Sequence, residues 1–434
     1  MDSYKILKEK IEKKQAKICV VGLGYVGLPL AVAFAREGYT VYGLDKNISR
    51  IEKLKKEEQY IVDVKPNEVL SLIKKKKFTP CADAKVLNTA EVVIICVPTP
   101  LRKVKIPDIS YVVDAAKTIG KYLKRQQLII LESTSPPTTT RKVVLPILEK
   151  SGLKSEKDFF LCFSPERVNP ADKNFPVTKI TKIVGGLSKD STVLAKALYS
   201  KIIKKIFVVS GPEVAETVKL LENTFRLVNI ALANEFAIVC NKLGISVWEV
   251  IDAAKTKPFG FMPFYPGPGL GGDCIPVTPL FFSWKAKKLG FKTKMIDLAS
   301  NVNRFMPTYV IHRLEALLKK DNTPLNKAKI LVLGVTYKKD VKDIRESPAL
   351  EIIKYLQIKG AKVNFYDPLI PYLKISKIDL KSVKLNMDDL KAYDCVAIVT
   401  DHSGVDYAAI KKNAKLIFDT RNVYKKNMDN VIRL

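Results

Sequence analysis

The chain has 434 residues, which is too long for one ordinary hydrophobic core and predicts two or three domains. Its 74 Lys and Arg outnumber 44 Asp and Glu, and the net charge of +30 favours anionic ligands. The lysines are scattered and are not interleaved with aromatic residues, so nucleic acid is not the expected partner.

The N-terminal residues 1–15 are charged and lack the apolar stretch of a signal peptide. No apolar run approaches the roughly 20 residues that a membrane helix needs, so we expect no membrane insertion. The seven cysteines form no CxxC pair, which argues against a metal site and against a disulfide framework. Together these features favour the reducing cytoplasm.

Short apolar runs in the first half of the chain indicate buried strands. They lie at 17–22, 40–45, 92–97, 128–131, 159–163 and 206–209. Helical patterns occur between several of them, and strands that alternate with helices predict a parallel, doubly wound sheet. We therefore expect a Rossmann-like domain over residues 1–211.

A glycine-rich loop follows the first strand and opens a helix, with Gly22, Gly24 and Gly27 at its key positions and Asp45 at the end of the next strand. Gly22 permits the tight turn, Gly24 lets a pyrophosphate approach the backbone, and Gly27 lets the helix pack closely on the strand. The helix N-terminus offers N–H groups to phosphates, and Asp45 can accept hydrogen bonds from ribose hydroxyls. This pattern predicts that the domain binds NAD.

Candidate site residues follow three further strands, at the carboxyl edge where parallel sheets bind ligands. They are Pro98 and Thr99, Ser133 and Thr134, and Glu166. Each one alone is better explained as a turn or capping residue. Three strand ends that meet the same sheet edge as the glycine loop, however, indicate a site.

After residue 212 the strand signal gives way to helical patterns. Residues 213–243 predict one long helix, and a Pro- and Gly-rich stretch at 257–279 precedes further helices over 280–318. We expect a central helical domain over 212–320.

Three polar residues, Lys219, Asn223 and Arg226, share one face of the long helix. A charged helix face is usually solvent-exposed. Here the flanking residues are apolar, so we expect the helix to be buried and these polar groups to meet a ligand phosphate, a sugar hydroxyl or a reacting oxygen.

One cysteine stands apart from the others. Cys274 follows a segment with four glycines between residues 267 and 272, which lets a ligand reach the backbone and the thiol. Cys81 has no reactive context, and the remaining cysteines lie in apolar runs that predict burial: Cys19, Cys96, Cys162, Cys240 and Cys395.

The opening pattern returns near the C-terminus, which predicts a second Rossmann-like domain over residues 321–434. Strands are expected within 328–337, 361–368, 393–400 and 414–424, and a helix at 347–360. The predicted fold class is α/β, with two Rossmann-like doubly wound domains joined by a long central helix and a helical middle domain.

Several segments, in this order, resemble the UDP-glucose/GDP-mannose dehydrogenase family of nucleotide-sugar 6-dehydrogenases from end to end. They are VVGLGYVGLPLA, CVPTP, ESTSPPTTT, SPERVNP, KLLENTFRLVNIALANE, YPGPGLGGDCIP and GVTYKKDVKDIRESPALEII. The forms of SPERVNP, NTFRLVNIALANE and YPGPGLGG are most similar to the branch that oxidises UDP-N-acetylhexosamines such as UDP-GlcNAc and UDP-ManNAc.

The resemblance implies a four-electron oxidation of a C6 hydroxyl to a carboxylate with two NAD molecules. Cys274 would trap the intermediate aldehyde as a thiohemiacetal, which is oxidised to a thioester and hydrolysed. Lys219 and Asn223 would stabilise the oxyanion, Glu166 would be the base for the hydrolytic water, and Thr134 would orient water or cofactor.

The resemblance also implies binding roles and an oligomer. Cofactor contacts are expected from Gly22, Gly24, Tyr25, Val26, Gly27, Asp45, Pro98, Thr99, Ser133, Thr134 and Arg345. UDP-sugar contacts are expected from Glu166, Arg167, Val168, Lys219, Asn223, Arg226, Tyr265, Gly267, Gly269, Gly271 and Lys338, with the C-terminal domain holding the UDP-sugar. A homodimer or larger homo-oligomer around the central helix is expected.

Two positions depart from the family pattern. Thr278 replaces the aspartate that usually stands four residues after the cysteine, and Asp273 replaces the histidine that commonly precedes it in this branch. Thr278 keeps a hydroxyl but no charge, so proton transfer should be weaker.

Three alternatives therefore remain open. The substrate could be UDP-glucose, with Arg226 as the residue to examine for an acetamido contact. The chain could be a catalytically impaired relative that binds a nucleotide sugar. A one-step 2-hydroxyacid dehydrogenase would explain the NAD domain and Lys219, but it leaves Cys274 and the third domain without a role.

Overall fold

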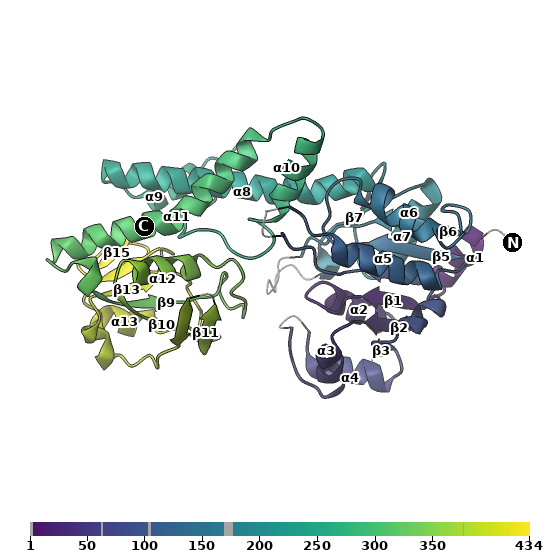
Figure 1. The fold of residues 1–434 in the computed structure, drawn as a ribbon, viewed down its shortest axis with the longest axis horizontal. Helices are drawn as coiled ribbons and strands as arrows, with labels where there is room; N and C mark the ends of the chain where they lie inside the picture. The colour runs from purple at the N-terminus through teal and green to yellow at the C-terminus, as the bar shows by residue number, and fades with distance from the viewer. Residues whose placement is uncertain (1–2, 62–63, 103–105, 169–176, 376) are drawn as a thin grey trace. The chain divides into compact units, whose positions relative to one another are not determined.

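The computed structural model describes residues 3–61, 64–102, 106–168, 177–375 and 377–434. The chain folds into two compact units, Met1–Glu222 with Leu280–Phe291 and Asn223–Pro279 with Lys292–Leu434 (Figure 1). Each unit has its own main sheet and its own hydrophobic core.

The sheet of the first unit has the strand order β3-β2-β1-β4-β5-β6-β7-β8. Its strands are β1 (Ile18–Val21), β2 (Val41–Leu44), β3 (Phe78–Cys81), β4 (Val92–Ile95), β5 (Gln127–Leu131), β6 (Phe159–Phe163), β7 (Lys182–Gly186) and β8 (Ile206–Val208). Strands β4 and β5 are buried on both faces, as a parallel sheet between two helical layers requires.

Helices cover both faces of this sheet. Helices α1 (Ser3–Glu12), α2 (Gly27–Arg36) and α7 (Lys189–Tyr199) pack in one core cluster, and α5 (Ser110–Tyr122) and α6 (Leu145–Glu149) pack in the other. Two further helices, α3 (Ile48–Lys55) and α4 (Pro66–Lys74), lie near β3. The doubly wound fold class predicted for this part of the chain is confirmed.

Strands β3 and β7 were not among the predicted elements, and β7 corrects the expectation of a wholly parallel sheet because it runs antiparallel to β6. A parallel return needs a crossover connection, usually a helix. The described residues between β6 and β7 contain only the short 3-10 turn Val177–Lys179. The antiparallel return brings Lys182, the first residue of β7, to the carboxyl end of β6.

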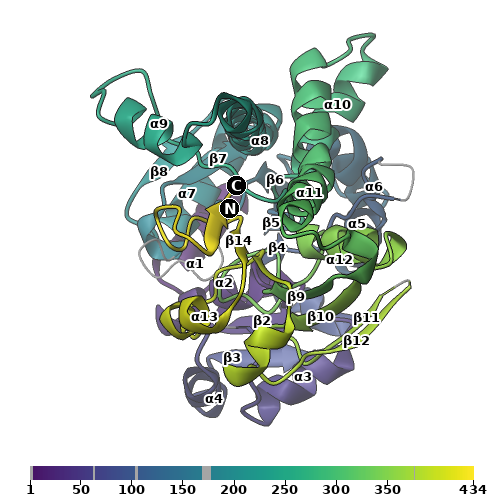
Figure 2. The same cartoon turned by 90° about the vertical axis from the view of Figure 1, so that its left-hand side faces the viewer.

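The main sheet of the second unit has the order β10-β9-β13-β14-β15, with all neighbours parallel. Its strands are β9 (Lys329–Leu333), β10 (Lys362–Tyr366), β13 (Cys395–Ile398), β14 (Ile417–Asp419) and β15 (Val431–Arg433). Helix α12 (Pro348–Ile358) and α13 (Tyr407–Asn413) belong to opposite core clusters, and a hairpin of β11 (Tyr372–Ile375) and β12 (Ile378–Lys381) lies beside β10 (Figure 2). The hairpin and β15 were not predicted.

The predicted central helices are α8 (Pro212–Leu243), α9 (Val247–Ala254), α10 (Thr278–Lys288) and α11 (Lys294–Lys320). The Asn303 side chain fastens α11 to α8, because its Nδ2 donates to the Leu227 carbonyl at 3.1 Å and its Oδ1 accepts from Asn234 Nδ2 at 2.8 Å. No described helix is long and apolar enough to cross a membrane.

The expectation that α8 is buried is wrong for a single copy of the chain. Leu227, Ala231 and Asn234 on one side of α8 are buried. Arg226 is exposed, and so is a stripe of large apolar side chains: Phe225, Leu232, Phe236, Val239 and Leu243. Apolar flanks alone therefore did not indicate burial within one copy.

Glu216, in the first turns of α8, holds the loop that follows β5. Its carboxylate accepts hydrogen bonds from the N–H groups of Thr138 at 2.6 Å and Thr140 at 2.8 Å, and from the Thr140 hydroxyl at 2.7 Å. The side chain is buried, and burial raises the pKa of Glu216 to about 7, although these hydrogen bonds act in the opposite direction.

We expect a pH-dependent stability from Glu216. A pKa of about 7 in the fold lies above the value of about 4.3 in an unfolded chain. Its contribution is therefore complete below about pH 4 and is lost as the pH rises through about 7, an effect of about 4 kcal/mol. Glu216→Gln does not titrate, so its unfolding free energy should improve relative to the parent protein between pH 5 and pH 8 in urea denaturation.

Glu235→Gln, at an exposed position of the same helix, is the matched control for removal of a carboxylate. A constant difference between Glu216→Gln and the parent protein at every pH would contradict the prediction.

Candidate active site

The glycine loop after β1 is shaped by two close backbone approaches. Gly22 has a φ of +96°, and a Cβ there would lie 2.7 Å from the Cys96 carbonyl oxygen. A Cβ on Gly27 would lie 1.9 Å from the Gly22 carbonyl oxygen. Larger residues at either position would displace the backbone, so both glycines are required by the packing of α2 on the sheet.

The same loop has an open face that fits a dinucleotide phosphate. Nothing lies within 4 Å of a Cβ built on Gly24, so the backbone there is accessible. Tyr25 is exposed and Val26 is half-buried just before α2 begins at Gly27. The first N–H groups of that helix and its positive dipole end suit a pyrophosphate.

Asp45 lies at the end of β2, where its carboxylate joins β2 to the glycine loop. Oδ2 accepts from the Leu23 N–H at 2.8 Å and pairs with Arg50 Nη1 at 3.2 Å, and Oδ1 accepts from the Asn47 N–H at 2.8 Å. A carboxylate oxygen has two acceptor sites, so Oδ1 keeps one for a ribose hydroxyl.

The predicted residues at the ends of β4 and β5 lie on the same sheet edge. Pro98 is exposed, and Thr99 and Thr134 are half-buried. Ser133 is buried, and its hydroxyl donates to the Val97 carbonyl at 2.8 Å. The Ser133 hydroxyl thus connects the two strand ends, and a bound cofactor would meet it as an acceptor.

Glu166 follows β6 and is held by its neighbours in the chain. Its Oε1 accepts from the N–H groups of Arg167 at 2.7 Å and Val168 at 2.6 Å. Arg167 donates to the Thr181 carbonyl at 2.8 Å and pairs with Glu222 at 2.5 Å. Asn169 and Pro170 of the SPERVNP motif lie outside the described residues.

The three polar residues predicted to share one face of α8 differ in solvent exposure. Lys219 is half-buried, Asn223 is 4% exposed, and Arg226 is exposed. Asn223 Nδ2 has no hydrogen-bond partner in the part of the chain that the structure describes. A buried amide donor without a partner is costly, so Asn223 is suited to donate to a ligand oxygen.

Cys274 is exposed, whereas the five cysteines predicted to be buried are buried and Cys81 is partly buried. The glycines before it pack against the loop after β9. A Cβ on Gly271 would lie 2.5 Å from Tyr337 Cβ, and the Gly272 N–H donates to the Arg345 carbonyl at 2.9 Å. The close contacts fix the backbone that carries the thiol.

An ion pair between Asp273 and Arg345 connects the cysteine loop to the loop after β9. Arg345 pairs with Asp273 through Nη1 and with Asp343 through Nη2 at 2.6 Å. The hydrogen bond to Asp343 and both carboxylate charges raise the pKa of Arg345. Within this unit Arg345 is therefore engaged with carboxylates, and its predicted contact with the cofactor stays a prediction.

The predicted sugar-binding residues around the cysteine loop are anchored to α8 and α9. The Tyr265 hydroxyl donates to Asp252 at 2.6 Å, and its ring stacks on Trp248 with centroids 5.8 Å apart. The Gly267 N–H donates to Asn234 Oδ1 at 2.9 Å. Gly269 has a φ of +135°, and a Cβ there would lie 2.9 Å from Pro348 Cβ.

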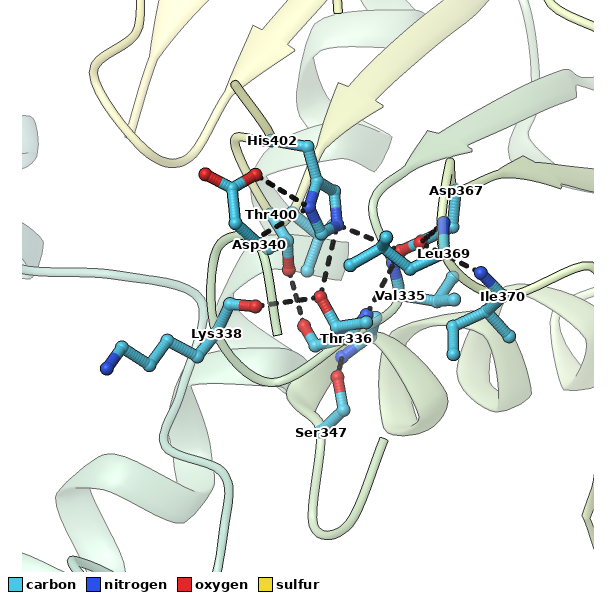
Figure 3. Close-up of polar contacts among 12 residues, drawn as sticks. Val335, Thr336, Lys338, Asp340, Ser347, Asp367, Leu369, Ile370, Thr400 and His402 are labelled. Carbon is cyan, nitrogen blue, oxygen red and sulfur yellow. Dashed lines mark hydrogen bonds and ion pairs between the residues drawn. The ribbon is translucent and has the colours of Figure 1, made fainter. Parts of the chain in front are cut away.

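Lys338 lies on the loop after β9, which a buried carboxylate organises (Figure 3). Asp367 Oδ2 accepts from the N–H groups of Val335 at 2.7 Å and Thr336 at 3.2 Å. The Thr336 hydroxyl donates to the Lys338 carbonyl at 2.9 Å. The Lys338 side chain points away from this cluster, so the loop presents it outward.

His402 completes the cluster and was not identified from the sequence. The Asp340 N–H donates to His402 Nδ1 at 3.1 Å, so Nδ1 is the acceptor and Nε2 carries the proton toward Asp367 Oδ2 at 3.0 Å. Burial alone would raise the pKa of Asp367, but hydrogen bonds from His402 and from the Val335 N–H hold it lower. A lone histidine outside any motif gave no signal of this role.

A second missed group, Glu132, Lys182 and Tyr199, lies beside Glu166 in the first unit. The available signal was Glu132, a charged residue directly after an apolar strand. Among the residues that the structure describes, no group of three or more His, Cys, Asp or Glu could hold a metal ion.

The site residues thus form two sets. The glycine loop, Asp45, the strand ends, Glu166 and Lys219 belong to the first unit, and Asn223, Arg226, the cysteine loop, Lys338 and Arg345 belong to the second. Within each unit the residues are brought together by the contacts described above.

Comparison with known proteins covers the same regions. Residues 16–203 match the NAD binding domain of the UDP-glucose/GDP-mannose dehydrogenase family, residues 213–305 its central domain, and residues 331–426 its UDP binding domain.

Individual relatives match over nearly the whole chain. A UDP-N-acetyl-D-mannosamine dehydrogenase of Methanococcus maripaludis is 36% identical over 95% of this chain and 94% of its own. A UDP-N-acetyl-D-glucosamine 6-dehydrogenase of Pseudomonas aeruginosa is 38% identical over 82% of this chain and 84% of its own. The structure of a UDP-D-ManNAc dehydrogenase from Pyrococcus horikoshii aligns with a TM-score of 0.87 at 34% identity, covering 96% of this chain and 98% of that chain. Because these similarities span all three regions in order, the chain belongs to the UDP-glucose/GDP-mannose dehydrogenase family and is an NAD-dependent oxidoreductase.

Proposed function

We propose that this protein oxidises the C6 hydroxyl of a UDP-N-acetylhexosamine to the carboxylate. The observation that carries the proposal is the exposed Cys274 in a rigid glycine loop, in a chain similar over most of its length to UDP-ManNAc and UDP-GlcNAc dehydrogenases. The proposal includes three domains: an NAD domain at 1–211, a helical middle domain with the cysteine loop at 212–320, and a UDP-sugar domain at 321–434. The family matches support this order.

The proposed cofactor contacts follow from the glycine loop and the strand ends. NAD, when bound, supplies a hydride acceptor for each of two successive oxidations. Gly22, Gly24 and Gly27 hold the pyrophosphate, Asp45 accepts from the ribose, and Ser133, Thr134 and Thr99 line the same edge.

Cys274 is the proposed nucleophile. Its thiolate adds to the C6 aldehyde left by the first oxidation, so that a C–S bond forms and the carbonyl oxygen becomes an alkoxide. Lys219 and the buried Asn223 amide donate to that oxygen. Loss of the second hydride gives a thioester on Cys274.

Glu166 is the proposed base for the last step. Water attacks the acyl carbon, one water proton passes to Glu166, the C–S bond breaks, and the sulfur leaves as a thiolate. Exposed Arg226 is the proposed contact for the acetamido group, and the Lys338 loop is the proposed site for the UDP-sugar.

We expect two NADH per UDP-GlcNAc or UDP-ManNAc consumed, and no free aldehyde. Cys274→Ser should lower kcat by roughly a thousandfold or more, because a hydroxyl does not replace the thiolate nucleophile. NADH absorbance together with product mass measures both quantities.

Cys81→Ser is the matched control, since Cys81 is a partly buried free thiol outside the site. Formation of one NADH per substrate would favour the hypothesis of a one-step 2-hydroxyacid dehydrogenase. Formation of no NADH with any UDP-hexose or UDP-hexosamine would reject the proposal.

The departure at Thr278 motivates the second candidate, a binder with impaired turnover. Thr278 is the first residue of α10, is 5% exposed, and donates its N–H to the Cys274 carbonyl at 3.3 Å. The side chain is thus adjacent to the cysteine backbone but carries no charge.

We expect Thr278→Asp to change kcat by less than about threefold, because Glu166 already supplies a carboxylate base for hydrolysis. Steady-state rates over a range of pH, with Thr278→Asn as the uncharged isostere of the Asp variant, measure the effect. A rise in kcat of roughly tenfold to hundredfold would favour the hypothesis that the protein is a binder with impaired turnover. UDP-glucose turned over faster than the acetamido sugars would favour the UDP-glucose alternative.

An oligomer is also part of the proposal, because α8 presents a continuous apolar stripe. Phe225, Leu232, Phe236, Val239 and Leu243 are exposed at helical spacing, and Met295 and Leu298 of α11 are exposed as well. Contiguous apolar surface of this kind is typical of interfaces between subunits. We propose that a second copy covers it, and that the protein is cytoplasmic, since its thiol chemistry needs a reducing compartment.

We expect a homodimer or larger homo-oligomer that Phe236→Glu converts to monomer, since a charge would be buried in the interface. Light scattering after gel filtration measures the mass. Ile358→Glu, at an isolated exposed position of α12, is the control and should leave the mass unchanged. A monomeric parent protein would contradict this proposal.

A further inference from the structure

A buried ionic cluster lies next to Glu166 in the first unit. Lys182 is 5% exposed, Glu132 is 1% exposed and Tyr199 is fully buried. A buried lysine is rare unless it is paired, because removing an ammonium group from water is costly.

The Lys182 ammonium lies close to two carboxylates and one aromatic ring. Nζ lies 2.9 Å from Glu132 Oε2 and 3.5 Å from Glu166 Oε2, and 5.0 Å from the centroid of the Tyr199 ring. The Tyr199 hydroxyl donates to Glu132 Oε1. Lys182 is therefore fixed from three directions.

The fold places these side chains by strand order. Glu132 directly follows β5, and Glu166 lies three residues after the end of β6. Lys182 begins β7, whose antiparallel pairing with β6 is reinforced by the Ser164 hydroxyl, which donates to the Ile183 carbonyl at 2.7 Å. A parallel β7 would have placed Lys182 at the opposite edge of the sheet.

Two carboxylates share this one cation. Burial raises the pKa of Glu132, and the Glu166 charge acts in the same direction. Burial by itself would lower the pKa of Lys182, but the charges of Glu132 and Glu166 raise it. The nearby thiols of Cys96 and Cys162 are kept neutral, since burial raises their pKa values, as it does for Tyr199.

The geometry leaves one oxygen of Glu166 for chemistry. Oε1 accepts two backbone N–H groups, and Oε2 has only the longer contact with Lys182 within the described ranges. Oε2 thus keeps acceptor capacity for a water, while the adjacent ammonium fixes its position.

We propose that Lys182 is a positioning residue that holds Glu166 Oε2 in place, with Glu132 and Tyr199 as the support that fixes Lys182. The proposal rests on the proposed function, in which Glu166 takes the proton of the hydrolytic water. Lys182 itself touches neither substrate nor cofactor in this role.

A purely structural role for the cluster predicts a different outcome. Buried ion pairs are often no more stabilising than apolar residues of similar volume. If Lys182 only filled the core, replacing it together with Glu132 by neutral residues would leave the protein folded and its catalysis unchanged.

The test is the double variant Lys182→Met, Glu132→Gln in the full-length protein. Lys182→Met alone leaves the buried Glu132 and the half-buried Glu166 without a cation and is at risk of misfolding. The double variant removes one charge of each sign, and thermal unfolding checks that it is folded.

We expect the double variant to lower kcat by roughly tenfold to hundredfold, with little change in KM for either substrate. The thioester on Cys274 should accumulate, and the intact mass of acid-quenched enzyme detects it.

Lys13→Met, Glu9→Gln is the matched control, because it removes one charge of each sign from an exposed ion pair of the same unit, and it should keep the parent kcat and intact mass. A folded double variant with parent kcat and no accumulated thioester would overturn the proposal. Failure of the parent protein itself to form NADH would instead reject the proposed function, so the two failures are distinguishable.

Discussion

Both sheets depend on one backbone arrangement at the turn after their first strand. A glycine with positive φ, Gly22 at +96° and Gly334 at +80°, donates its N–H to the last carbonyl of the neighbouring strand at 2.8 Å in each case. The N–H of the residue after each glycine donates to a carboxylate: Leu23 to Asp45 at 2.8 Å, and Val335 to Asp367 at 2.7 Å. No Cβ fits at either glycine, because it would lie 2.7 Å from the Cys96 carbonyl oxygen just after β4 or 2.2 Å from the Thr400 carbonyl oxygen just after β13. The loops that carry the candidate ligand contacts are therefore set by backbone geometry.

The two copies of this arrangement then diverge in their side chains. Asp45 pairs with the half-exposed Arg50 and keeps acceptor capacity toward a ligand. Asp367 points into the fold, where its carboxylate accepts hydrogen bonds from His402 and from four backbone N–H groups. Its oxygens are therefore engaged within the protein. The second loop consequently offers Lys338 rather than a carboxylate. This difference accounts for one fold serving both a dinucleotide site and a UDP binding domain in the same chain.

Short sequence patterns predicted the features that depend only on residues close together in the chain. The glycine loop, the strands before Asp45 and Glu166, and the exposed Cys274 follow from spacing and apolar runs. Lys182 could not be recognised, because a lysine usually indicates surface, and its burial depends on Glu132 and Glu166, which are distant in the sequence. The direction of β7 depends on its connection rather than its composition. The face of α8 was mispredicted because an apolar helix can be covered by another subunit as readily as by its own chain.

The charges around the site explain how so basic a protein can use carboxylates beside phosphate ligands. Three carboxylates at the proposed site each contact a cation: Asp45 with Arg50, Glu166 with Lys182, and Asp273 with Arg345. Paired in this way, they contribute little repulsion toward an approaching diphosphate, so the field of the +30 chain remains attractive there. Lys182 offsets the charge of the proposed base Glu166, and Arg345 offsets the charge of Asp273 beside the proposed nucleophile Cys274. Attraction of two anionic ligands and retention of the proposed carboxylate base are compatible because each of these three carboxylates contacts a cation, which Glu166 shares with Glu132 and Asp273 shares with Asp343.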